Sequence, residues 1–384
     1  MRGKNVSDIG EKARTIFLAV IMITSVMAAG VAFTGSTAAD APPDSPNPNP
    51  GNLQVSLLNE SNGAKVTFGV NTTSKTINKT NATNSDVAVG SVNSDFDNTA
   101  KAIQFAIDNA TTEYSTVSVG PGIYNSSSDI LIDSDGLTLE GADGASSTII
   151  GQSSVAVTST TPSVEIADLR IENPDGSRAV RVTNNATGVV IQDNTVTNVN
   201  TNNDANQPRG IVVGGLDGGD SADGLEIRNN TVTNVEGATA DKKQAHAIQI
   251  LEESNRSELN GDGLIENVVV DGNTIENITD TRSTVAVNFN GHIEGEITNN
   301  DISGLNTEGN PTNASPGAGF TQVIALNEGG NAADGPQNVT IEGNDISDIE
   351  TTASEEAINF APPYHIIIGS TADAETISIK NNGF

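Results

Sequence analysis

Acid–base chemistry in this sequence would fall to Glu252, His292 and Glu328, because Glu252 and Glu328 follow short apolar segments at a matched distance and His292 stands one step further along its own segment. Two carboxylates that flank a glycosidic bond can serve as its general acid and base. The alternative is a solvated acidic rim on an acidic protein. These three residues are therefore candidate catalytic residues, although they complete no recognised catalytic set.

An amide side chain stands at one position in three of the same segments. Gln249, Asn288 and Asn359 each lie between two apolar residues. Amides donate and accept hydrogen bonds, which suits them to sugar hydroxyls. We predict that these residues form a ligand-binding face for a polysaccharide or a cell-surface glycan.

A glycine-rich loop, GGLDGGDSADG (214–224), carries Asp217, Asp220 and Asp223. Carboxylates on a flexible loop can hold calcium, but this spacing matches neither an EF-hand nor a glycine–aspartate nonapeptide repeat. The alternative is an ordinary acidic loop. No other cofactor is expected, and His246 and His365, which have no second ligand nearby in the sequence, are predicted to be surface residues.

Sequons for N-glycosylation crowd the N-terminal third. Exposed loops are where such acceptors are used. The predicted sites there are Asn59, Asn71, Asn78 and Asn81.

Composition excludes several classes of function. The chain has no cysteine, so it holds no disulfide, thiolate metal site or cysteine nucleophile. Its 49 acidic against 18 basic residues give a net charge of −31, which repels nucleic acid and anionic lipid. Such acidity is typical of proteins that work in high salt, where screening weakens the repulsion. The basic residues look too dispersed to hold a polyuronate without a metal.

The first 95 residues divide into three parts. Residues 1–39 combine a basic start, an uncharged apolar run from Ile16 to Phe33 and small residues, which predicts a cleaved signal peptide and no lasting membrane span. An uncleaved anchor is the alternative. Residues 40–50 form a proline-rich spacer. Residues 51–95 are rich in threonine and asparagine and predict a few strands or a decorated stalk.

From residue 96 the chain repeats a pattern of strand, asparagine turn and strand, and a further short strand follows most repeats. One repeat cannot bury its apolar face alone, so neighbouring repeats must stack. The turn asparagines are Asn194, Asn230, Asn273, Asn300, Asn344 and Asn382. Asparagine tolerates left-handed backbone angles, and stacked amides can hydrogen-bond to one another.

An antiparallel sandwich and a parallel solenoid could both be built from such repeats. The similarity runs from repeat to repeat and the loops vary in length, which favours a parallel β-helix over residues 96–384. The further short strands then give two inward rows, both wholly apolar. The first row is Ile211, Ile248, Val287, Ile324 and Ile358, and the second is Val213, Ile250, Phe289, Leu326 and Phe360. On this stacking, at about 4.8 Å per coil, Glu252 and Glu328 would lie about 10 Å apart, just beyond the separation in inverting glycosidases.

The stretch TAKAIQFAIDNATTEYSTVSVGPGIYNSSSDILIDSDGLTLEGADGASSTII (99–150) resembles the opening of right-handed β-helix proteins of the pectate lyase-like superfamily. The resemblance implies an all-β, right-handed parallel β-helix with a short N-terminal capping helix, here at Ala102, Ile103, Ala106, Ile107 and Ala110. It implies no single activity, since this fold hosts lyases, hydrolases and non-enzymes. The signal segment resembles those of haloarchaeal surface-layer glycoproteins.

These features together predict a secreted, halophilic surface or matrix protein that binds glycan without catalysis. The alternative is a polysaccharide lyase or glycoside hydrolase.

Overall fold

The computed structural model describes residues 53–71, 73–80, 86–92, 98–142, 147–183, 187–200, 207–214, 222–237, 244–251, 264–309, 320–327, 335–353, 364–369 and 376–384. The predicted signal peptide and spacer lie outside these residues. Within them the chain is nearly all strand, with one α-helix. Among the described residues no helix has the length and apolarity to cross a membrane.

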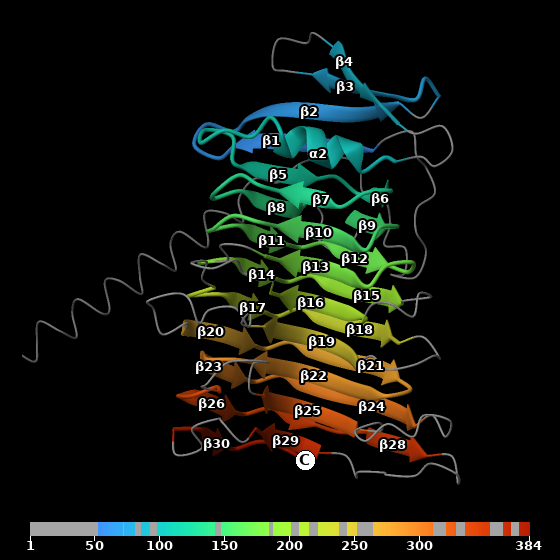
Figure 1. Cartoon of the computed structure of the whole chain (residues 1–384). Coiled ribbons are helices and arrows are strands. Elements are labelled where there is room, and N and C mark those ends of the chain that lie inside the picture. Colours follow the sequence, from blue (N-terminus) through green and yellow to red (C-terminus); the bar gives the residue numbers. More distant parts are fainter. Residues whose placement is uncertain are drawn as a thin grey trace, which may run out of the picture. The chain divides into compact units, whose positions relative to one another are not determined.

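Three parallel sheets, named I, II and III in the order in which the chain visits them, form a right-handed β-helix (Figure 1). Sheet I stacks β5 (Thr116–Val119), β8 (Thr138–Gly141), β11 (Glu165–Ala167), β14 (Val190–Gln192), β17 (Glu226–Arg228), β20 (Ile265–Asp271), β23 (Ile293–Thr298), β26 (Val339–Glu342) and β30 (Ser378–Lys380). Sheet II stacks β6 (Gly122–Ser126), β9 (Ser147–Gly151), β12 (Arg170–Asn173), β15 (Thr195–Asn200), β18 (Thr231–Glu236), β21 (Thr274–Asp280) and β24 (Asp301–Gly309), then β27 (Asp345–Ile346) and β28 (Ile349–Ala353). Sheet III stacks β7 (Ile130–Ile132), β10 (Val155–Ser159), β13 (Arg178–Val182), β16 (Arg209–Val213), β19 (Gln244–Leu251), β22 (Ser283–Asn290), β25 (Phe320–Asn327) and β29 (Tyr364–Ile368).

The N-terminal end of the solenoid is capped. Helix α2 (Lys101–Ile107) buries Ala102, Ile103, Ala106 and Ile107, as predicted, and packs against β1, β2, β5 and β7. Ala110, the fifth residue assigned to this helix, follows its end and is half-buried. Four antiparallel strands extend sheet I beyond β5: β1 (Gln54–Asn59), β2 (Ala64–Asn71), β3 (Thr76–Thr80) and β4 (Asp86–Ser91). The N-terminal region therefore continues sheet I and shares the core of the β-helix through residues such as Val55 and Phe68.

The predicted inward rows are confirmed through β25. Ile211, Ile248, Val287 and Ile324 pair in sequence, as do Val213, Ile250, Phe289 and Leu326, and none is exposed to solvent. Each row buries one apolar side chain per coil, and this burial is the main stabilising contribution of the stack.

The last step of both rows was predicted wrongly. Ile366 and Ile368 of β29 take the places assigned to Ile358 and Phe360, which lie outside the described residues. The segments EAINF and YHIII both alternate apolar residues, so alternation alone does not choose between them. Pairing with β25 selects the later segment.

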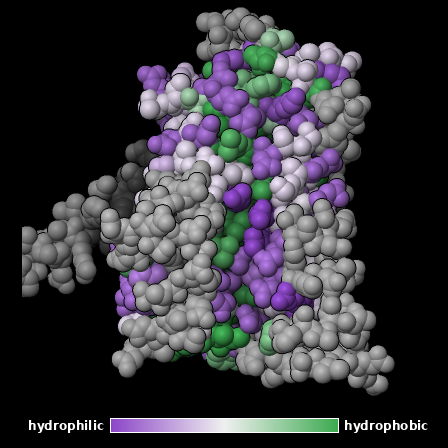
Figure 2. Space-filling view, viewed as in Figure 1, coloured by the Kyte–Doolittle hydropathy of each residue, from purple (hydrophilic) through white to green (hydrophobic). Residues whose placement is uncertain are grey.

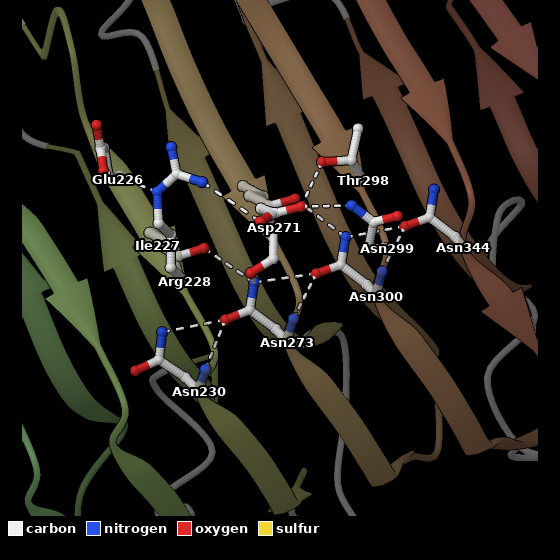
Figure 3. Close-up of polar contacts among 11 residues, drawn as sticks. Glu226, Ile227, Arg228, Asn230, Asp271, Asn273, Thr298, Asn299, Asn300 and Asn344 are labelled. Carbon is white, nitrogen blue, oxygen red and sulfur yellow. Dashed lines mark hydrogen bonds and ion pairs between the residues drawn. The ribbon is translucent and has the colours of Figure 1, made fainter. Parts of the chain in front are cut away.

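The turn asparagines form a buried ladder (Figure 3). Each amide accepts a hydrogen bond from the backbone N–H and side-chain Nδ2 of the asparagine one coil earlier, as Asn273 does from Asn230 at 2.9 and 3.0 Å. Each Nδ2 also donates to a backbone carbonyl, as Asn273 does to Ile227 at 2.9 Å. The predicted stacking of these amides is confirmed from Asn194 to Asn382.

The residue before each ladder asparagine has a left-handed backbone. Asn229 and Asn299 have φ of 53°, and Gly272 and Gly343 have φ of 66° and 69°. Only glycine, asparagine and aspartate adopt this conformation readily, which explains the Asn-Asn, Gly-Asn and Asp-Asn pairs of the repeat.

Replacing Asn273 by leucine should lower the free energy of unfolding by about 2–6 kcal/mol. The change leaves the backbone N–H of Asn230 and the carbonyl of Ile227 buried without partners, at about 1–3 kcal/mol each. Denaturant unfolding measures the loss. Asn200→Ala, which removes an exposed contact to Glu236, is the control and should change stability by no more than about 0.5 kcal/mol. An Asn273→Leu protein as stable as the parent would contradict the role of the ladder.

Asp280, at the end of β21, is a buried carboxylate with 5% exposure. Its Oδ1 accepts a hydrogen bond from the backbone N–H of Arg282 at 2.6 Å. A Cβ at Gly237 would lie 1.7 Å from its Oδ2, so only glycine fits there. Burial raises the pKa of Asp280 to about 7. The backbone hydrogen bond from Arg282 and the charge of Arg282 act in the opposite direction and only partly offset this rise.

The raised pKa makes stability depend on pH. The folded state holds a proton on Asp280 that the unfolded state has released above about pH 4, so stability falls as the pH rises from about 4 to about 7. The difference in unfolding free energy between the parent and Asp280→Asn, measured across this range, isolates the contribution of Asp280. A difference that does not vary with pH would refute the assignment.

Candidate functional site

The outer surface of sheet III owes its side-chain pattern to a bend within each strand. Ala179, Gly210 and Ala247 occupy one equivalent position in successive strands, and there the neighbouring strands do not pair. The residues on both sides of this position pair regularly. A Cβ on Gly210 would lie 2.6 Å from Cγ1 of Val232 in sheet II, so this position faces the core. Position 211 faces the core as well. Side chains at positions 209 and 212 therefore both point outward.

Three arginines meet on this outer surface. Arg178 of β13 and Arg209 of β16 stand directly in register, about 4.8 Å apart along the stack. Arg181 lies three residues after Arg178. Because the bend places the two intervening side chains inward, Arg181 faces outward like Arg178. Arg209 donates from Nη2 to Oε1 of Gln207, and its Nε is buried without a hydrogen-bond partner among the described residues.

No carboxylate of the described residues forms an ion pair with these arginines, whereas Arg170 and Arg228 elsewhere are both paired. Burial, together with the positive charges of Arg178 and Arg181, lowers the pKa of Arg209 to about 10. Burial and Arg181 also lower the pKa of Arg178, and Asp129 opposes them. The cluster of Arg178, Arg181 and Arg209, named the arginine cluster, is therefore a positive site without an ion-pair partner in the described part of the chain.

His246 and Gln249 of β19 continue this surface into the next coil. His246 pairs in register with Arg209 and is fully buried, contrary to the prediction of a surface histidine. Its Nε2 lies 3.3 Å from Nε2 of Gln249. Burial, and then the charge of Arg209, lowers the pKa of His246 to about 3, so the ring is neutral at physiological pH. Oε1 of Gln249 is buried without a partner among the described residues.

Further amides follow on the next two strands. Gln249 pairs with Asn288, as predicted, and Asn290 pairs with Asn327. Nδ2 of Asn327 donates to Oδ1 of Asn288 at 3.2 Å. Figure 2 shows hydrophilic side chains, with apolar ones between them, down the strands of sheet III. We name Gln249, Asn288, Asn290 and Asn327 the amide patch.

The amide row does not extend as predicted. Position 325, beside Asn288, is alanine, and Ile367 follows it in β29 where Asn359 was expected. Asn359 itself, Glu252, Glu328, Asp217 and Asp220 lie outside the described residues, and their predicted roles remain predictions.

Two other predicted site residues lie elsewhere. His292 follows β22 with 8% exposure, and its backbone carbonyl accepts a hydrogen bond from Ile265 at 3.0 Å. Asp223 accepts a hydrogen bond from the backbone N–H of Glu266 at 2.8 Å, next to sheet I. Within the described part of the chain no group of three or more histidines or carboxylates is placed to hold a metal ion.

The described sequons differ in accessibility. Asn71 is exposed, and its Oδ1 accepts hydrogen bonds from the backbones of Thr73 and Ser74. Asn78 is half-buried in β3. Asn59 is 4% exposed, with its Oδ1 bound to Ser61, a poor position for a glycan acceptor. Asn81 lies outside the described residues.

Sequence reasoning missed the arginine cluster because its members are dispersed in the chain. Arg178 and Arg209 are separated by a full coil. The available signal was the similarity of RAVRV (178–182) to RGIVV (209–213), which aligns the two arginines at the start of equivalent strands.

No protein family and no curated protein matches the sequence. A Geobacillus virus E2 protein, ORF18, aligns with 83% of this chain and 66% of its own at 13% identity and a TM-score of 0.26. The Agl-KA catalytic domain aligns with 74% of this chain and 65% of its own at 11% identity and a TM-score of 0.21. The chain thus spans just under two thirds of each structure, and similarity this low bears on neither fold nor activity.

In the ligand-free protein, the arginine cluster should not contribute to the free energy of unfolding, and its like charges should lower it. Replacing Arg209 by glutamine removes one of three neighbouring like charges and the unpartnered Nε. In about 1 M salt, where long-range attraction to the acidic surface is screened, we expect the unfolding free energy to stay unchanged or to rise by up to about 1 kcal/mol. Thermal unfolding measures it. A loss of more than about 1 kcal/mol would show that the cluster has a structural role.

Proposed function

We propose that this protein is an extracellular β-helix protein that binds an acidic glycan on the outer surface of sheet III, without catalysis. The arginine cluster carries the proposal. In a chain of net charge −31, three arginines without ion-pair partners among the described residues stand together on one surface.

The chemistry of the side chains supports this ligand class. The planar guanidinium group binds carboxylate or sulfate groups through two hydrogen bonds. The half-buried amides of Asn290 and Asn327 offer partners for sugar hydroxyls. Because the rest of the chain is strongly acidic, an anionic ligand is repelled elsewhere and directed to the cluster.

The extracellular location is inferred from the sequence. Residues 1–39 have the organisation of a signal peptide, and residues 99–150 resemble the pectate lyase-like superfamily, whose members act on or bind extracellular material. The acidic composition supports a halophilic source. The mass of the N-terminal peptide of the exported protein tests cleavage of the signal.

A polysaccharide lyase is the second candidate, and one observation favours it. Arg209, with its pKa lowered to about 10, is a better proton acceptor than an ordinary arginine, and β-elimination of an acidic sugar needs a base. In that reaction the deprotonated Arg209 side chain would take the proton from the carbon next to the sugar carboxylate, and the bond between the β-carbon and the glycosidic oxygen would break. The oxygen leaves with a proton from water, and the new chain end carries a double bond.

Binding to immobilised acidic and neutral polysaccharides at fixed salt tests the proposal. Arg178→Gln and Arg209→Gln should each weaken binding to the acidic glycan about 10- to 100-fold, because each removes a charge-assisted hydrogen bond of about 1.5–3 kcal/mol. Arg170→Gln is the control, since Arg170 lies on sheet II, paired with Glu172.

Absorbance of an unsaturated product, recorded in the same samples, separates the two candidates. We expect none from the parent. Product formation that disappears in Arg209→Gln would replace the binding function by the lyase. Equal affinity of parent and both arginine variants would overturn the site itself.

A further inference from the structure

We propose that the ligand is a mixed glycan in which an acidic stretch about two coils long is followed by neutral sugars, with the acidic stretch toward β13 and the neutral stretch toward β25. The inference rests on the proposed function and specifies its substrate class. The observation that carries it is the change from charged to uncharged outward positions along sheet III, from β13 to β25.

The positive charge is confined to two adjacent strands. Arg178 and Arg181 lie on β13 and Arg209 lies on β16. On the N-terminal side, Thr158 of β10 donates to Asp129 at 3.4 Å, so the surface turns negative there. The cationic stretch is therefore about one to two coil spacings long, or roughly 5–10 Å along the axis.

The outward positions of β22 and β25 carry no charge, although Arg282 directly precedes β22. They are Val285, Asn288 and Asn290 in β22 and Gln322, Ala325 and Asn327 in β25. Asn290, Gln322 and Asn327 are half-buried, and the other three are buried. His246, on the strand between the two stretches, is fully buried, and its ring is neutral.

A uniformly charged polymer does not match this arrangement. From β13 to β25 the surface extends over four coil spacings, or roughly 19 Å. A polyanion of that length would place its outer charges over neutral amides, in the field of a chain of net charge −31. Charged groups that lose water without gaining a counter-charge oppose binding. Neutral sugars over the amide patch gain hydrogen bonds without this penalty.

The test uses the full chain at one fixed salt concentration and three oligosaccharides of equal length. One is uniformly charged, one is neutral, and one has two acidic sugars followed by neutral sugars. Each charged probe is prepared in a uronate and a sulfated form, which identifies the anionic group. We expect the mixed probe to bind at least about 10-fold more tightly than either other probe, and charged oligomers to gain no affinity beyond two to three sugars.

Two variants separate the stretches. Asn290→Ala combined with Asn327→Ala changes half-buried residues outside the core and should weaken the mixed probe about 10-fold, while leaving a charged disaccharide unaffected. Arg178→Gln should weaken both, and circular dichroism confirms that each variant is folded.

Affinity of charged oligomers that rises steadily with length to five sugars would overturn this inference and leave the proposed function standing. An amide-patch variant that binds the mixed probe as tightly as the parent would do the same. Failure of all three probes to bind would overturn the proposed function as well.

Discussion

The register of the solenoid from β11 onward depends on the buried asparagine ladder, whose first member, Asn194, bonds back to Ile166 and Leu169. At each coil one amide both accepts from the asparagine before it and donates to the one after it, so each coil is hydrogen-bonded to its neighbours at a single fixed residue. A slip of one residue would leave these amides and the backbone groups they satisfy unpaired inside the protein. Because the slip is excluded, residues far apart in the chain are held at fixed neighbouring positions.

The functional surface inherits its order from this register. Arg178 lies beside Arg209, and Gln249 beside Asn288, because their coils are locked to one another at the ladder. The intervening loops differ in length from coil to coil, yet they do not disturb the pairing. Each of these repeats carries a basic or amide residue at an equivalent position. Stacking of the coils therefore aligns these residues in a linear array of binding groups, with a spacing of about 4.8 Å.

The sequence predicted the fold well because its strongest constraints are local and repeated. The ladder asparagines, the left-handed residues before them and the inward rows each recur at equivalent places, so one repeat explains the next. The last coil was misjudged because EAINF and YHIII both satisfy that pattern. The site was harder to predict. Glu252 and Glu328 were selected for their chemistry within one segment, whereas the arginine cluster becomes visible only when two strands are aligned.

The bend in sheet III joins the core to the site. A plain strand alternates sides, so residues three apart point in opposite directions. Here two successive positions face inward, and the first of them carries only small residues in the coils that hold the site, Ala179, Gly210 and Ala247. The bend therefore brings residues three apart, Arg178 with Arg181 and His246 with Gln249, onto one surface. A side chain larger than glycine at Gly210 would meet Val232 and the carbonyl of Ala247, the latter at 2.7 Å. The small residues in the core are thus the condition for two parallel columns of binding groups outside it.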